Sequence, residues 1–251
     1  MKIISIELYK LRHKRITLML ILFLLVEIAW TFMATSKSIS SNPENATWEM
    51  LIAIVASING LFLPILTAIC VSRICDMEHK GDTLKLLLST SMKRGELYAA
   101  KYVSAAILMI LVSILQIFSI MIFGIMNNFK ESVPLFLFVR LLIGTTLTSL
   151  IVIAFQQWIS MAVKNQAFSL CLGMIGGFIG MTADLFPAKV RSLFIWSYYT
   201  GLSPVTQSYA NEKIQFIIRD VSSLIPAMAA LIVVGICIYM VGSFQVSRQE
   251  I

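Results

Sequence analysis

The chain has 251 residues, of which 58% are hydrophobic and 13% are charged, and its formal net charge is +7. Soluble domains average about 25% charged residues, whereas several apolar runs here reach the roughly 20 residues that a helix needs to cross a bilayer. The composition therefore predicts an all-α integral membrane protein and excludes an ordinary soluble domain. A net positive charge is typical of basic cytoplasmic loops, and no nucleic-acid partner is predicted.

The first predicted element precedes the membrane-spanning part. Residues 1–15 read MKIISIELYKLRHKR, in which Ile4, Leu8 and Leu11 fall on one helical face. The basic residues between them are available for the phosphates of membrane lipid. We expect an amphipathic helix that lies at the membrane surface before the first span.

Six apolar segments are predicted to span the membrane. They cover about 16–35, 50–75, 102–126, 135–163, 167–187 and 224–245. With both termini in the cytoplasm, 13 of the 20 Lys and Arg residues lie on the cytoplasmic side and 6 lie outside, while Arg140 lies within a span. This asymmetry predicts a multi-pass protein of the cytoplasmic membrane with both ends inside. We expect one membrane domain over residues 1–251.

Two features of the spans stand out. Glu27 lies in the middle of the first span, and an ionisable group at that depth is a functional-site hypothesis by default. It either pairs with a polar neighbour inside the bundle or lines a substrate path. The fifth span carries two overlapping GxxxG patterns, which are Gly173 with Gly177 and Gly176 with Gly180. They predict close helix packing.

The last outer loop, about 188–223, is rich in aromatic residues. Rings of this kind favour the headgroup layer. We therefore expect the loop to lie on the outer surface as short helices.

Motifs for an enzyme are missing from the sequence. It contains no GxxxxGK[ST], no GxSxG and no HExxH, and its two histidines are His13 and His79. A P-loop nucleotide site and a zinc-protease site both need such motifs. The sequence therefore predicts no enzyme activity, no metal site and no cofactor bound by the chain itself.

The charged stretch DMEHKGDTLKLLLSTSMKRGELYAAK, residues 76–101, separates the second and third spans. Its leucines share one helical face, and Thr83 or the residue before it can cap a first turn. We expect a short amphipathic helix at about 79–91 and a second helix that runs from near Glu96 into the third span. Such a helix either binds lipid or presents a ridge to a soluble partner.

This segment resembles the coupling segment of type-2 ABC exporter permeases, with the pattern E-x-x-x-G-T, then L-L-L-x-(S/T)-P, then R and K. The matching positions are Glu78, Gly81, Thr83, Leu87, Arg94 and Lys101. Glu78 lies three rather than four residues before the glycine, and Ser91 stands where the family often has proline. In that family the segment is the coupling helix, which docks into a groove of a separate ATPase subunit.

The resemblance implies a role for each position. Glu78 and Arg94 would make polar contacts, Gly81 would form the turn, Leu87 would dock, and Lys101 would anchor the third span at the headgroups. The partner ATPase would carry ATP and magnesium.

At 251 residues and without a large external domain, the whole chain most resembles the lantibiotic-immunity and bacitracin-resistance permeases. This implies a permease subunit of a Gram-positive bacterial ABC transporter that expels a lantibiotic-type antimicrobial peptide from the membrane. Its partners would be an ABC ATPase and a second, homologous permease in a heterodimer. Two alternatives stay open: a general exporter of lipid, drug or polysaccharide, and a non-transporting immunity protein that sequesters the peptide.

Overall fold

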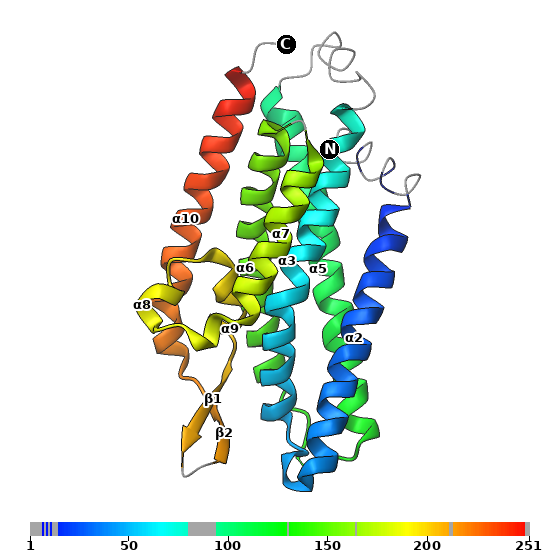
Figure 1. The fold of residues 1–251 in the computed structure, drawn as a ribbon, viewed down its shortest axis with the longest axis vertical. Helices are drawn as coiled ribbons and strands as arrows, with labels where there is room; N and C mark the ends of the chain where they lie inside the picture. The colour runs from blue at the N-terminus through cyan, green and yellow to red at the C-terminus, as the bar shows by residue number, and fades with distance from the viewer. Residues whose placement is uncertain are drawn as a thin grey trace.

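The computed structural model describes residues 7, 9, 11, 15–79, 94–129, 131–163, 165–210 and 213–248. Within these ranges, the longer helices run side by side along one axis (Figure 1). They are α2 (Ile16–Ser41), α3 (Trp48–His79), α5 (Arg94–Met126), α6 (Leu135–Ala162), α7 (Gln166–Met181) and α10 (Val221–Arg248). Helix α3 contacts α2, α5, α6 and α7, so it forms the centre of the bundle.

The two ends of the bundle differ in what they hold. The end of α3, the start of α5 and the end of α10 lie together at one end (Figure 1). We call it the inner end, after the orientation that the basic residues predict. The opposite, outer end holds the 3-10 helix η1 (Pro43–Asn45) and the connection from α5 to α6.

Five of the described helices are long and apolar enough to cross a membrane, which supports the prediction of a multi-pass membrane protein. They are α2, residues Trp48–Asp76 of α3, α5, α6 and α10. Helix α7, in the fifth predicted span, has 16 residues. At 1.5 Å per residue it covers about 24 Å, which is less than the roughly 30 Å of a hydrocarbon core. A sixth crossing therefore stays a prediction.

The outermost helices expose apolar side chains along their length. Leu22 and Leu25 of α2 and Val233, Ile236 and Met240 of α10 are all about half exposed or more. In a bilayer such faces contact lipid tails or another apolar protein surface, whereas α3 is enclosed by its neighbours.

A left-handed residue separates the N-terminal segment from α2. Positions 7, 9 and 11 are helical, and Arg15 has φ 54°, a conformation that L-residues rarely adopt. Leu11 is buried and Tyr9 is exposed, so this segment has an inner and an outer side. Ile4 and Leu8 of the predicted amphipathic face lie outside the described residues.

The all-α prediction is wrong at the outer end. Strands β1 (Val205–Ala210) and β2 (Lys213–Ile218) form an antiparallel hairpin in which Val205 pairs with Ile218. The strands contain β-branched and aromatic residues, which favour a pleated, half-buried surface. The expected short helices precede the hairpin; they are η2 (Ala183–Leu185), α8 (Ala188–Arg191), η3 (Ile195–Ser197) and α9 (Tyr198–Gly201).

Two aromatic residues of this segment lie inside the protein rather than in the headgroup layer, which corrects that expectation. Trp196 and Tyr199 belong to a core cluster with side chains of α3, α5 and α6. The Trp196 ring lies edge-on to Phe155, 5.7 Å between centroids. Gly176 faces the indole, and its missing side chain leaves the room that the ring occupies.

Candidate functional site

The predicted coupling segment connects α3 to α5. The predicted coupling helix, with Gly81, Thr83 and Leu87, lies outside the described residues. Glu78 lies in the last turn of α3, and Arg94 is the first residue of α5, where it is half-buried. Both of these helix ends lie at the inner end of the bundle (Figure 1).

Lys101 lies two turns into α5, and its side chain is buried. Its Nζ donates a hydrogen bond to the carbonyl oxygen of Ile74 in α3 at 2.8 Å and lies 3.5 Å from Oε2 of Glu7. Lys101 and Glu7 are each 1% exposed. The ammonium of Lys101 is therefore contacted by α3 and by the N-terminal segment. The role expected for Lys101 as an anchor at the headgroups stays a prediction.

The same part of α5 contacts two further helices. The backbone oxygen of Tyr98 accepts a hydrogen bond from Nε2 of Gln157 in α6 at 2.8 Å. The Tyr98 ring lies 5.3 Å from that of Tyr239 in α10, between centroids. The hydroxyl of Tyr102 donates to the carbonyl of Leu150 at 3.1 Å. The start of α5 is thus joined to α3, α6 and α10.

A polar cluster occupies the interior between α2, α3 and α5. The amide nitrogen of Gln116 lies 2.6 Å from Oε1 of Glu27 and 2.6 Å from Oδ1 of Asn59. With its amide turned over, Asn59 instead donates to Glu27 Oε1 at 2.9 Å. None of the three side chains is more than 2% exposed. Each helix therefore contributes one polar group to the cluster.

The contacts favour one of the two alternatives for Glu27, a polar partner inside the bundle. Gln116 is one of the few polar side chains within the third predicted span, and Asn59 was not singled out from the sequence. The signal for Asn59 was its place in the middle of a long apolar segment, where an amide needs a partner.

The glycine patterns lie at the tightest helix contact. Three of the glycines face α3, which are Gly173, Gly177 and Gly180. A Cβ on Gly177 would lie 2.6 Å from the carbonyl oxygen of Leu61, so α7 approaches the α3 backbone directly. Gly176 points away from α3, toward Trp196.

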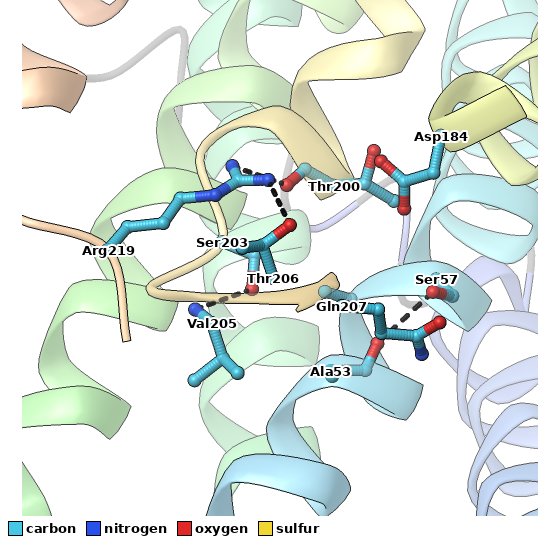
Figure 2. A pocket seen from close by; sticks show the side chains of 10 residues that line it. Ala53, Ser57, Asp184, Thr200, Ser203, Val205, Thr206, Gln207 and Arg219 are labelled. Atoms are coloured by element: carbon cyan, nitrogen blue, oxygen red, sulfur yellow. Dashed lines mark hydrogen bonds between the residues drawn. The ribbon is translucent and has the colours of Figure 1, made fainter. Parts of the chain in front are cut away.

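A small polar cleft lies toward the outer end, which sequence reasoning did not find (Figure 2). Ala53 and Ser57 of α3 line one side, and Asp184, Thr200, Thr206 and Arg219 line the other. Hydroxyl groups, one carboxylate and one guanidinium therefore line the cleft. The sequence held little signal for it, because its two sides are more than a hundred residues apart.

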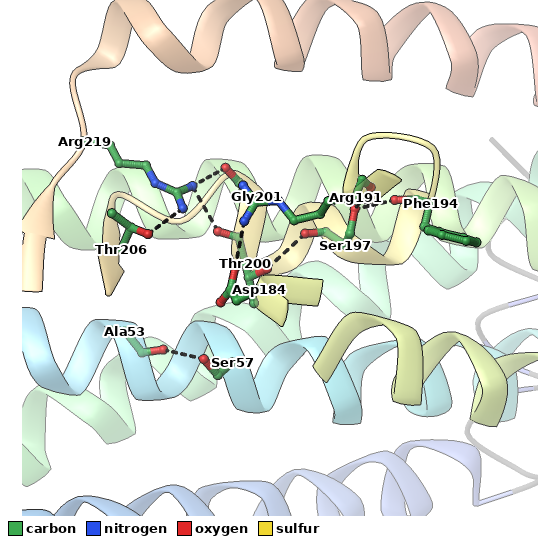
Figure 3. Close-up of polar contacts among 10 residues, drawn as sticks. All are labelled: Ala53, Ser57, Asp184, Arg191, Phe194, Ser197, Thr200, Gly201, Thr206 and Arg219. Atoms are coloured by element: carbon green, nitrogen blue, oxygen red, sulfur yellow. Dashed lines mark hydrogen bonds and ion pairs between the residues drawn. The ribbon is translucent and has the colours of Figure 1, made fainter. Parts of the chain in front are cut away.

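Arg219 fastens the base of the hairpin. Its guanidinium donates to the carbonyl oxygens of Thr200 at 3.2 Å and Gly201 at 2.5 Å, and to Oγ1 of Thr206 at 2.9 Å (Figure 3). Arg140 of α6 donates to the backbone oxygen of Arg219 at 2.6 Å. Arg140, which lies within a predicted span, thus reaches the hairpin base.

Two further charges lie near this guanidinium. Arg191 pairs with Asp184 at 2.8 Å. Burial lowers the pKa of Arg219, because it removes water from the cation, and the nearby charge of Arg191 adds to the effect. The hydrogen bonds to neutral oxygens compensate part of that cost.

The described residues contain no group of three or more His, Cys, Asp or Glu side chains that could hold a metal ion. Polar contacts instead connect elements near the inner end of the bundle, in its interior, and at the base of the hairpin. The arrangement defines a multi-pass membrane protein in which the helix ends on either side of the charged segment lie together at the inner end.

The family model for ABC-2 family transporter proteins matches residues 3–180, and the chain therefore belongs to that family. The match begins in the N-terminal segment and ends in α7. No curated protein sequence matches the chain. Membership confirms the resemblance to type-2 ABC permeases and makes the chain the membrane component of a transporter that works with an ATPase partner.

Proposed function

We propose that the chain is a permease subunit of a Gram-positive bacterial ABC transporter that moves a lantibiotic-type peptide out of the cytoplasmic membrane. The proposal is based on membership of the ABC-2 family. It is supported by the ends of α3 and α5, which lie together at the inner end on either side of the charged segment (Figure 1).

In this proposal the coupling helix at about 79–91 docks on the ATPase. Glu78 and Arg94 make polar contacts with it, and Leu87 enters its groove. ATP and magnesium bind the ATPase, and the chain itself binds no cofactor. ATP binding closes two ATPase subunits, and the motion enters α3 and α5. Because Tyr98 in α5 packs against Tyr239 in α10, the motion also reaches the last helix.

A second permease completes the transport path in this proposal. The exposed apolar faces of α2 and α10 offer surfaces for the second subunit and for lipid. The peptide is expected to contact the outer halves of the helices and the segment 182–220. Both termini lie in the cytoplasm, and α7 with the segment after it forms the sixth crossing.

The test is peptide resistance in a sensitive Gram-positive host that expresses the chain with its ATPase and sister permease. We expect resistance with release of peptide into the medium, lost when the ATPase is omitted. Resistance that persists without the ATPase would indicate sequestration. Absence of resistance in the intact complex would favour export of lipid, drug or polysaccharide.

A variant pair sharpens the test. Leu87→Asp places a charge on the docking face of the coupling helix and is expected to abolish resistance and co-purification of the ATPase. Leu115→Ala changes a leucine that is 50% exposed on the apolar face of α5 and is expected to retain both. Equal resistance and equal ATPase binding in the two variants would count against the coupling assignment.

A further inference from the structure

We propose that Glu27 is a proton-binding site inside the membrane domain, with its carboxyl group held in the neutral acid form and the proton on Oε2. Glu27 takes no part in the proposed docking of the ATPase or in the proposed contact with a peptide. The site is therefore independent of the proposed function and of the cargo that the transporter moves.

Glu27 lies far from both ends of its helix. α2 runs from Ile16 to Ser41, so at a rise of 1.5 Å per residue Glu27 is about 17 Å from one end and about 21 Å from the other. Its side chain is 0% exposed, whereas the preceding Leu25 and Val26 are both more than half exposed. The carboxyl group therefore lies inside the bundle, and a glutamate side chain is too short to bring it to water at either end.

The two carboxyl oxygens of Glu27 have different surroundings. Oε1 lies 2.6 Å from the amide nitrogen of Gln116, and with its amide turned over Asn59 also donates to Oε1, at 2.9 Å. Oε2 is buried and has no hydrogen-bond partner among the described residues. A carboxylic acid has this asymmetry, because one oxygen only accepts hydrogen bonds while the other carries the proton. The contacts therefore indicate Oε1 as the carbonyl oxygen and Oε2 as the hydroxyl.

The described groups around the carboxyl of Glu27 carry no positive charge. Gln116 of α5 and Asn59 of α3 contact it, and both are neutral amides. The hydroxyl of Thr31 donates to the backbone oxygen of Glu27 at 2.9 Å. Tyr199 of α9 interacts with Glu27 electrostatically, and a phenol is not a cation in either protonation state. In the part of the chain that the structure describes, no cation therefore balances a carboxylate at this position.

Burial without a cation decides the charge of the group. An ionised carboxylate removed from water is far more costly than a neutral polar group, and an unpaired one takes up a proton instead. Hydrogen bonds from amides to Oε1 offset part of that cost, but Oε2 receives none. Protonation removes the charge and keeps the bonds to Oε1, because a carbonyl oxygen also accepts them.

The bound proton depends on the contact between three helices. Glu27, Asn59 and Gln116 come from α2, α3 and α5, so a separation of α2 from the other two helices would admit water to the carboxyl group. A carboxyl group in water is ionised near neutral pH. Opening of this cluster therefore releases a proton, and closing it takes one up.

Infrared spectroscopy of the purified full chain in detergent tests the charge state. Near neutral pH exposed carboxyl groups are ionised, so a C=O stretching band of a protonated carboxyl, which shifts on transfer to D2O, reports a buried acid. We expect the difference spectrum between the unaltered protein and Glu27→Gln to contain one such band. Glu7, which is also buried, is present in both samples and cancels.

Glu44→Gln is the matched control, because Glu44 is exposed in η1. It is expected to leave the protonated-acid band unchanged. A carboxylate band in place of the acid band in the difference spectrum of Glu27→Gln would overturn the proposal, since Glu27 would then be ionised.

A second variant keeps the test decisive if Glu27→Gln does not fold. Gln116→Leu removes the amide that donates to Oε1, and a C=O group that loses a hydrogen bond absorbs at higher frequency. We expect the acid band to move to higher frequency in this variant. An unmoved band would show that it belongs to another carboxyl group, and the proposal would fail.

Discussion

Gly60 of α3 and Gly180 of α7 face each other so closely that a Cβ on Gly60 would lie 2.6 Å from the carbonyl oxygen of Gly180. The neighbour is backbone rather than the end of a flexible side chain. A methyl group at either position must therefore move one helix away from the other. A very close helix contact therefore lies between α3, the central helix, and α7, which has 16 residues.

We predict that Gly60→Ala lowers the free energy of unfolding by about 1–3 kcal/mol, the usual cost of overpacking. Thermal unfolding of the purified protein in detergent measures it. Gly95→Ala is the matched control, because a Cβ there meets nothing within 4 Å and alanine favours a helix. Equal midpoints for the two variants would contradict the tight contact between α3 and α7.

The interior polar cluster predicts a second effect. Gln116→Leu removes the amide that contacts both Glu27 and Asn59, and it leaves their buried polar groups with fewer partners. We expect a loss of about 1–3 kcal/mol in the same unfolding assay. Glu27→Gln keeps a hydrogen-bonding group at that site and is expected to cost less. If Gln116→Leu were as stable as the unaltered protein, the cluster would not hold the three helices together.

The hairpin base predicts a third effect. Arg219→Gln removes the guanidinium that donates to Thr200, Gly201 and Thr206, so we expect faster amide exchange in residues 205–218. Arg219→Lys is expected to behave similarly, because an ammonium lacks the planar fork of donors. Arg191→Gln is the control: its ion pair with Asp184 is partly exposed, and such pairs contribute about 0–1 kcal/mol. Unchanged exchange in Arg219→Gln would show that other contacts hold the hairpin.

Two tryptophans provide a fourth test. Trp48 is 1% exposed, and its indole nitrogen donates to the carbonyl oxygen of Glu131 at 2.9 Å. Trp48→Ala is expected to cost about 3–5 kcal/mol. Trp30→Ala, at a position 52% exposed on α2, is expected to cost far less in detergent. Comparable losses would mean that Trp48 does not anchor the outer end of the bundle.

Apolar segment length was enough to predict most of the helices. The prediction that a helix starts near Glu96 and enters the third span is met by α5, which runs unbroken from Arg94 to Met126. The signal is strong because a span needs a long run of apolar residues, and such a run is visible without any knowledge of tertiary contacts.

Tertiary contacts explain what the sequence did not predict. Lys101 stands at the start of a span, where a lysine usually reaches the headgroups, and its contact with Glu7, nearly a hundred residues earlier, was not predicted. Trp196 and Tyr199 are typical interfacial residues, yet both are buried in the bundle. Asn59 was recognisable only as an amide within a long apolar segment, and its partners lie on two other helices.

The short length of α7 limits what can surround the outer half of the bundle. After Met181 the chain continues through short helices and turns rather than one long helix. In hydrocarbon every backbone N–H and C=O must be paired within the protein, and irregular backbone is tolerated only against protein or water. The side of the bundle formed by residues 182–204 is therefore unsuited to direct contact with lipid tails. Any part of this side that lies at the depth of the hydrocarbon core therefore needs a neighbouring subunit or a water-filled space beside it, and the annular lipids would leave a gap there.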